Sequence, residues 1–192
     1  ADIKLVIPPL MSSMDFMNSI KNQKVNKDSI AIWYLGQNGF IIKEHGGNTI
    51  CIDPYLSNYC GEADKYQDHA FRLDRQLPIF IKPQDLDVDI VLITHSHDDH
   101  ADPLTIPKIK KNTIFIGPWE AYQKFKFFGI NEKQCRLIHP NQNIDILGSK
   151  IFGTFALPTD QTDLNHMGFI LKFSNGITFF NSGDTDFTEL LG

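Results

Sequence analysis

A dense run of histidine and aspartate residues constrains this chain more than any other feature. The run His95-Ser96-His97-Asp98-Asp99-His100 directly follows Asp89–Thr94, a continuous apolar segment that predicts a β-strand buried on both faces. A strand end is a rigid platform, and the loop after it can turn several side chains toward one point. The fold must therefore contain a sheet that holds this strand in its interior.

Short apolar segments separated by turns predict strands along most of the chain. Segments 30–35, 40–43 and 49–52 follow one another closely and predict an antiparallel meander. Helices are expected from Pro103 to about Lys111 and from Trp119 to Phe128, the second ending at Gly129. More strands are expected at 113–116, 136–138, 144–147, 150–155, 168–173 and 177–181. Strands dominate, so we predict a mixed α/β (α+β) fold with two sheets packed face to face and helices outside, an αββα sandwich.

The length of the chain suits one domain. We treat residues 1–192 as a single domain that begins with an N-terminal extension, 1–29, containing a short helix. Residues 57–77 are polar and irregular, and a loop of that length tends to be functional or mobile. A short helix or turn is expected at 83–86.

Charge and composition exclude several classes of protein. The formal net charge of −5 argues against a general nucleic-acid binder, which needs a basic face. No apolar segment is long enough to cross a membrane, and the segment before Pro8-Pro9 lacks a basic leader. The three cysteines have no pairing pattern and are expected to be reduced thiols. We therefore expect a cytoplasmic protein that binds neither nucleic acid nor membranes.

The histidine run is suited to binding divalent metal. Imidazole nitrogens and carboxylate oxygens are ligands that such ions prefer. The alternation of His95 and His97 directs two rings the same way, while Asp99 and His100 can reach an adjacent position. These residues exceed the needs of one ion and predict two metals with a bridging water. The structural alternative is a solvated loop, or a helix N-cap that uses Asp98 or Asp99.

Two further carboxylates follow apolar segments in the same way. Asp184, in Asn181-Ser182-Gly183-Asp184-Thr185, projects at a strand end and is expected to be a metal ligand. Asp53, which precedes Pro54, is expected either to hydrogen-bond a metal-bound histidine or to start a turn.

His166, just before the strand at 168–173, is a candidate to complete a metal position with His95 and His97. A satisfied surface histidine is the alternative, and Asp160 and Asp163 in the same loop are rival ligands. The remaining histidines have no ligand-type partners nearby in the sequence and are expected to be structural or exposed: His45, His69 and His139.

Together these residues resemble the metallo-β-lactamase superfamily, and within it the L-ascorbate-6-phosphate lactonase branch. The superfamily resemblance rests on the segment from Thr94 to His100, on Asp53, and on Ser182-Gly183-Asp184-Thr185. The branch resemblance rests on segments 31–36, 46–53 and 115–118. The resemblance covers the chain from about residue 29 to the end.

The resemblance implies an αββα sandwich, a divalent metal site and hydrolysis by a metal-bound hydroxide. It implies that the metal of the lactonase branch is manganese, with zinc as the alternative, and that the protein is a homo-oligomer. The segment Ala156–Asp160 has no histidine where many superfamily members carry their third, which leaves His166 or an aspartate to replace it. Family members are longer, and their last metal-binding histidine lies beyond residue 192. We therefore expect a C-terminally incomplete fold that is poorly soluble alone or packs against further chain.

These features predict a metal-dependent, lactonase-like hydrolase acting on the carbonyl of a small anionic lactone or ester. The resemblance alone suggests a sugar-acid lactone phosphate. Asp99 is the candidate to orient the water or accept its proton. Lys65, Arg72 and Arg75 are candidates for binding a phosphate or carboxylate tail, although loop charges are more often only solvated. The alternatives are phosphodiester cleavage, or other hydrolysis, on the same fold and an inactive metal-binding domain.

Overall fold

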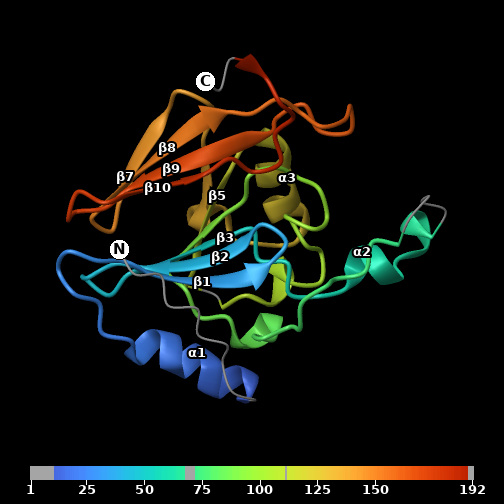
Figure 1. Ribbon diagram of the computed structural model, residues 1–192. Helices are drawn as coiled ribbons and strands as arrows, with labels where there is room; N and C mark the ends of the chain where they lie inside the picture. Colours follow the sequence, from blue (N-terminus) through green and yellow to red (C-terminus); the bar gives the residue numbers. More distant parts are fainter. Residues whose placement is uncertain (1–10, 68–71, 111, 190–192) are drawn as a thin grey trace.

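The apolar segments form two β-sheets in the computed structural model, which describes residues 11–67, 72–110 and 112–189 (Figure 1). The first sheet has the strand order β1-β2-β3-β4-β5-β6. The first three strands pair antiparallel, which confirms the predicted meander, and β3 to β6 pair parallel. The strands are β1 (Ala31–Gly36), β2 (Gly39–Lys43), β3 (Thr49–Ile52), β4 (Ile90–Leu92), β5 (Ile114–Gly117) and β6 (Cys135–Leu137).

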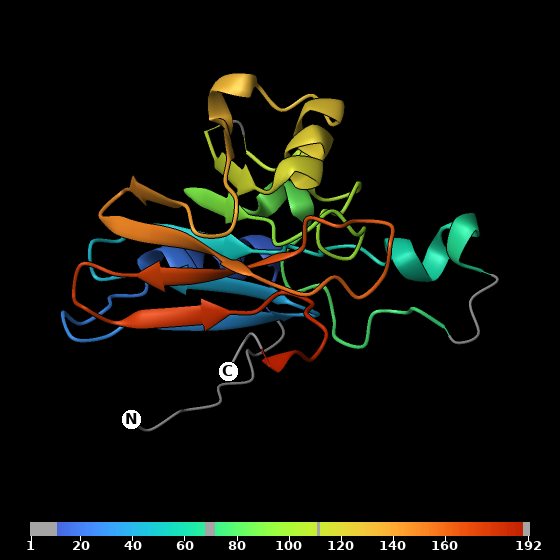
Figure 2. The same ribbon diagram turned by 90° about the horizontal axis from the view of Figure 1, so that it is seen from above.

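The second sheet is antiparallel throughout, with the order β10-β9-β8-β7. It lies over the first sheet, and in Figure 2, which is seen from above, its orange and red strands lie in front of the blue and cyan strands. The sequence pattern predicted these four strands to within one residue at each end. They are β7 (Asn143–Ile146), β8 (Ser149–Phe155), β9 (Met167–Lys172) and β10 (Thr178–Asn181).

Alternating side chains of both sheets form the core between them. Ile42 and Leu92 of the first sheet belong to one buried cluster with Ile151, Phe169 and Leu171 of the second. Strands β3 and β4 are buried on both faces, which explains their continuous apolar sequence.

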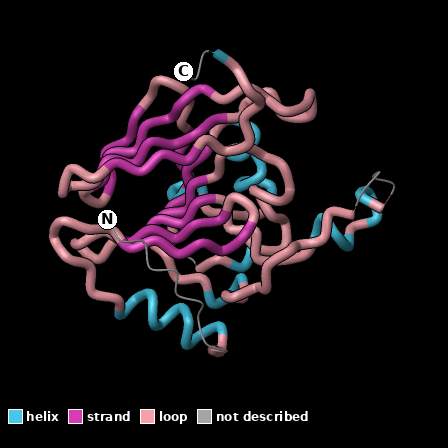
Figure 3. Tube along the Cα trace, in the orientation of Figure 1, coloured by secondary structure: helices cyan, strands magenta, loops and turns pink. Residues whose placement is uncertain are grey.

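The other face of the first sheet packs against helices. Helix α1 (Ser13–Asn22) buries Phe16 and Ile20, and α3 (Trp119–Phe127) buries Phe125, in a second apolar cluster. Figure 3 shows the strands in two layers with α1 outside the first. The structure therefore contains an α layer and two β layers of the predicted sandwich, and among the described residues no helix covers the outer face of the second sheet.

Two expectations about local structure need correction. The helix predicted from Pro103 to about Lys111 is only a 3-10 turn, Ile106–Lys108, and Lys111 itself lies outside the described residues. Pro107 has no N–H to donate to the carbonyl of Pro103, as an α-helix over 103–111 would require, and the Asp102 side chain holds a local turn by accepting from the Leu104 N–H at 2.9 Å.

The long polar segment 57–77 is less irregular than expected where it is described. It contains the single helical turn α2 (Tyr59–Glu62) and a 3-10 turn, Asp64–Tyr66. The short turn expected at 83–86 is the 3-10 turn Pro83–Asp85. Among the described helices, none has the length and apolarity needed to span a lipid bilayer.

The parallel part of the first sheet determines where the polar residues meet. Asp53 follows β3 and the histidine run follows β4, and these neighbouring parallel strands end at the same edge. The chain turns sharply at Asp53, whose φ of 41° lies in the left-handed region. This turn directs the Asp53 carboxylate into the protein, where it is fully buried.

Candidate metal centre

Three loops at one end of the sandwich bring four histidine rings and one aspartate together. The loop after β4 supplies His95, His97 and His100, and the segment before β9 supplies His166. The His95 ring centroid lies 3.8 Å from that of His166, 4.0 Å from that of His100 and 4.5 Å from that of His97. The loop after β10 adds Asp184.

Two overlapping groups of side chains have the composition of metal sites. The first contains His95, His97 and His166, and the second contains His95, His100 and Asp184. Within each group one potential ligand atom from every residue lies within 4.8 Å of the others. Both groups share His95, so its imidazole is the centre of the cluster.

His166 has the geometry of a metal ligand. Its Nδ1 lies 2.9 Å from the carbonyl oxygen of Asp184, and because a carbonyl only accepts, Nδ1 carries the proton. Nε2 then has a lone pair, is buried, and has no hydrogen-bond partner among the described residues. A buried imidazole nitrogen without a partner, facing two more imidazoles, fits a divalent ion.

His100 is oriented by Asp53. Its Nδ1 lies 2.7 Å from Oδ2 of Asp53, while its Nε2 faces Oδ2 of Asp184 at 3.3 Å. Burial alone lowers the pKa of His100, but the carboxylates of Asp53, Asp184 and Asp99 outweigh burial and raise it. The sequence-based expectation that Asp53 hydrogen-bonds a histidine of the cluster therefore agrees with the structure.

Sequence reasoning missed the residues that hold Asp53. The Thr94 N–H and hydroxyl donate to its two oxygens at 2.8 and 2.6 Å, and Asn38 donates to Oδ2 at 2.7 Å. Asn38 also exchanges two side-chain hydrogen bonds with Asn181, at 3.0 and 2.9 Å. Asn181 in turn accepts from the Gly183 N–H at 2.9 Å, which links this network to the Asp184 loop. No sequence pattern relates residue 38 to residue 181.

Gly183 is required at its position by space and backbone geometry. Its φ is 59°, and a Cβ there would lie 2.8 Å from the Met167 carbonyl oxygen and 2.9 Å from a Thr94 side-chain atom. A glycine therefore allows the Asp184 loop to lie directly against the strand that follows His166.

The three remaining candidate carboxylates differ in their surroundings. Asp163 is buried and accepts from the Ser96 and Asn165 N–H groups at 2.7 Å each, so both of its oxygens hold the loop. Asp160 lies 3.4 Å from Nε2 of His97 at the surface. Asp99 lies 3.7 Å from Nε2 of His100 and is in neither of the two groups above.

Histidines outside the cluster are where the sequence indicated, as far as they are described. His45 is exposed on the β2–β3 turn, and its Nδ1 lies 2.8 Å from the carbonyl oxygen of Val25. His139 follows β6 and is half-buried. His69 lies outside the described residues.

The expected anion-binding role of Arg75 is not compatible with its surroundings. Its guanidinium donates to the carbonyl oxygens of Tyr55 and Leu35, so it joins the segment after β3 to β1. Arg72 pairs with Asp74 and its side chain is 85% exposed. Lys65 points to the histidine run instead, where it pairs with Asp98.

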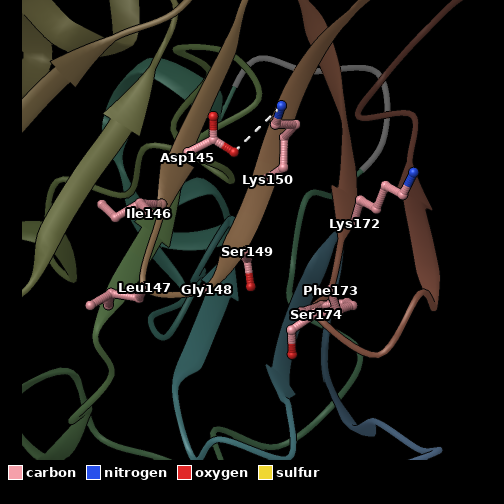
Figure 4. Close-up of a pocket in the computed structure, with 9 residues that line it drawn as sticks. All are labelled: Asp145, Ile146, Leu147, Gly148, Ser149, Lys150, Lys172, Phe173 and Ser174. Atoms are coloured by element: carbon pink, nitrogen blue, oxygen red, sulfur yellow. Dashed lines mark ion pairs between the residues drawn. The ribbon is translucent and has the colours of Figure 1, made fainter.

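A cleft with a volume of about 900 Å³ opens onto the cluster. His97, Asp99 and Asp184 line it together with residues of the 57–77 segment and of α3. A second cavity of about 570 Å³ lies at the opposite end of β9, where Lys172 and the β7–β8 turn line it (Figure 4). Its charged groups include the ion pair of Lys150 and Asp145 at 3.6 Å but no histidine or cysteine, whereas the larger cleft is lined by His97, Asp99 and Asp184.

Comparison with known proteins agrees with this arrangement. A family model described as "Beta-lactamase superfamily domain" matches residues 31–186. A curated protein from Escherichia coli O127:H6, "Probable L-ascorbate-6-phosphate lactonase UlaG", is 23% identical over 209 residues, covering 88% of this chain and 58% of that protein. The chain thus spans little more than half the length of the curated relatives that it matches.

Solved structures share the fold at low identity. One described as a possible metal-dependent hydrolase, from Veillonella parvula, has a TM-score of 0.64 at 22% identity and covers 85% of this chain and 66% of that chain. Igni18, a metallo hydrolase from Ignicoccus hospitalis, has a TM-score of 0.57 at 22% identity, covering 84% of this chain and 64% of that one. The diiron β-hydroxylase CmlA from Streptomyces venezuelae has a TM-score of 0.60 at 18% identity, covering 82% and 30%.

Proposed function

This chain belongs to the β-lactamase superfamily, and we propose that it carries the metal site of a hydrolase acting on a small anionic lactone or ester. The observation that carries this proposal is the buried, unpartnered Nε2 of His166 beside His95 and His97. An imidazole nitrogen without a partner costs stability in a closed core, and a bound cation removes that cost.

The side chains divide into ligands and groups that orient them. His95, His97 and His166 would hold one divalent ion, and His100 and Asp184, with Asp99 beside them, would hold a second, either manganese or zinc. Such an ion supplies a water of lowered pKa and polarises a carbonyl oxygen. Asp53 keeps the proton of His100 on Nδ1, so that Nε2 is available to the site.

Asp99 is the proposed proton acceptor. It lines the cleft next to the ligands, and its side chain is 32% exposed. A carboxylate at the edge of the cluster can orient the attacking water and take its proton. Aspartate at this position would therefore be needed more for the rate of reaction than for holding the metal.

The lactone assignment rests on the curated relatives, whose printed name is an L-ascorbate-6-phosphate lactonase. The cleft volume of about 900 Å³ suits a small molecule. We therefore propose a sugar-acid lactone, with or without a phosphate, as the first substrate class to test.

The test is turnover after the protein has been stripped with a chelator and reloaded with manganese or zinc. We expect hydrolysis of lactones that depends on added metal and is lost in Asp99→Asn, while His45→Ala, far from the cluster, retains it. Hydrolysis of phosphodiesters in place of lactones would favour the phosphodiesterase alternative. Absence of all turnover in a metal-loaded protein would favour an inactive metal-binding domain.

A further inference from the structure

Asp98, inside the histidine run, is the meeting point of two lysines from distant parts of the chain. Its Oδ1 accepts from Nζ of Lys124 on α3 at 2.6 Å. Its Oδ2 accepts from Nζ of Lys65 and from the Tyr66 hydroxyl, the latter at 2.8 Å. The Asp98 side chain is only 8% exposed, so one buried carboxylate holds two ammonium groups.

Two ammonium groups share this one carboxylate, and Nζ of Lys65 also lies 5.4 and 4.9 Å from the ring centroids of Tyr59 and Tyr66. A buried carboxylate is neutralised by a single cation, and burying a second costs free energy unless it has another partner. The two lysines are not buried to the same degree as Asp98, since the side chain of Lys65 is 55% exposed and that of Lys124 is 27% exposed. Both line the cleft that contains His97 and Asp99.

Both lysine side chains keep exposed surface and line the cleft, whose lining also contains Asp99, Asp160 and Asp184. Each ammonium has three N–H donors, and the carboxylate engages one from each. The remaining donors of the two groups can serve the three terminal oxygens of a phosphate, whereas a carboxylate has only two oxygens. Arg75 is engaged by carbonyl oxygens and does not line the cleft. Arg72 lines the cleft, but its side chain is 85% exposed and only its pairing with Asp74 orients it.

We propose that Lys65 and Lys124, positioned by Asp98, form a phosphate-binding subsite in the wall of the cleft. The subsite rests on the proposed function, since it would hold the phosphate of a substrate whose reacting carbonyl lies at the histidine cluster. Asp98 is a positioning residue: it keeps two flexible lysines at one point and reduces their mutual repulsion. Lysine binds phosphate as a point charge, so the subsite tolerates different tails.

The experiment is a calorimetric titration of the metal-loaded full chain with inorganic phosphate. Metal ions also bind phosphate, so the comparison between variants isolates the lysines. We expect Lys65→Gln and Lys124→Gln each to weaken phosphate binding about tenfold or more, because each loses a charge-assisted contact. Lys124→Arg should restore most of the affinity. The matched control is Lys126→Gln, an exposed lysine on the same helix that does not line the cleft.

Two results would overturn the subsite. One is equal phosphate affinity in the wild type and both glutamine variants, with a lowered Tm in the variants, because the lysines would then be a structural clamp for Asp98. The other is failure of the wild type to bind phosphate at all. If Lys124→Gln does not fold, Lys65→Gln carries the same test, since Lys65 is the more exposed of the two.

The titration separates this proposal from the proposed function because it needs no turnover. A protein that binds phosphate through the lysines but hydrolyses no lactone retains the subsite and loses the hydrolase assignment. A protein that hydrolyses lactones with unchanged phosphate affinity in the variants retains the hydrolase assignment and loses the subsite.

Discussion

Single hydrogen bonds decide which ring nitrogen each histidine presents to the cluster. The Asp184 carbonyl holds the proton of His166 on Nδ1, and the Asp53 carboxylate does the same for His100. In both residues the opposite nitrogen, Nε2, is the one left for the site. The surrounding protein thus fixes which nitrogens face the cluster, which would lower the reorganisation that binding of a cation requires.

His97→Ala should remove at least one metal equivalent per chain. Its Nδ1 lies 3.0 Å from Nε2 of His95, so alanine removes a nitrogen from the group that also contains His166. Elemental analysis of purified protein measures the metal content, with His45→Ala as the control. Undiminished metal content in His97→Ala would contradict the assignment of the histidine run to metal binding.

Asp53→Asn should weaken metal binding about 10- to 100-fold without unfolding the protein, which is the usual cost of losing a partner of a ligating histidine. Asparagine is the appropriate replacement because it has nearly the same shape and tolerates the left-handed φ of 41° at this position. Competition with a chelator measures the affinity. The control is Asp145→Asn at the far end of the second sheet, and equal affinities in the two variants would show that Asp53 does not act through His100.

At the scale of elements, the site is a consequence of where strands end. Neighbouring parallel strands β3 and β4 deliver Asp53 and the histidine run to one edge of the first sheet. The start of β9 and the end of β10, which pair antiparallel, deliver His166 and Asp184 to one edge of the second sheet. The Asn38–Asn181 pair joins the two edges, so the sheets must be packed before the cluster exists.

Arg75→Ala should destabilise the fold rather than alter anion binding. Its guanidinium joins β1 to the segment after β3, and alanine leaves two carbonyl oxygens without that donor. We expect the free energy of unfolding to fall by about 1–3 kcal/mol, measured by denaturant titration. Arg72→Ala, which removes a largely exposed ion pair, is the control and should change stability much less than Arg75→Ala does. A selective loss of phosphate binding in Arg75→Ala, with unchanged stability, would reverse this interpretation.

At the scale of the molecule, the outer face of the second sheet carries one apolar row beside a polar row of Lys150, Lys172 and Thr178. Phe180 pairs with Ile170, which pairs with Phe152, and residues directly opposite one another project on the same side of a sheet. Because side chains alternate along a strand, this row projects from the face of the sheet that points away from the core residues Ile151, Phe169 and Leu171. Phe180 remains 54% exposed. An exposed apolar row favours association, and we propose that the chain forms a homo-oligomer.

Phe180→Thr should reduce self-association of these 192 residues. Threonine keeps the strand propensity of the position and removes the largest exposed ring of the row. Light scattering over a range of concentrations measures the change, and metal content should be unaffected because the residue faces away from the core. A wild-type chain that is monomeric at all concentrations and unfolds cooperatively would contradict the expectation.

The sequence by itself determined the strands, the central position of β4 and the family to which the chain belongs. Those features depend on local patterns: apolar periodicity, turn residues and a run of metal-ligand side chains within six positions. The helix predicted at 103–111 was wrong because proline and an aspartate turn outweighed the apolar spacing there. Apolar periodicity alone does not take account of such local effects of proline and aspartate.

Only the tertiary structure decided which distant residues join the cluster and what the loop charges do. His166 rather than Asp163 lies among the histidines because both Asp163 oxygens hold backbone N–H groups, and the sequence left both as candidates. Lys124 was not a candidate at all, since α3 approaches Asp98 only after the first sheet is packed. Arg75 contacts backbone carbonyl oxygens in place of the expected anion for the same reason. Contacts between segments far apart in the chain depend on packing, which a local sequence pattern does not predict.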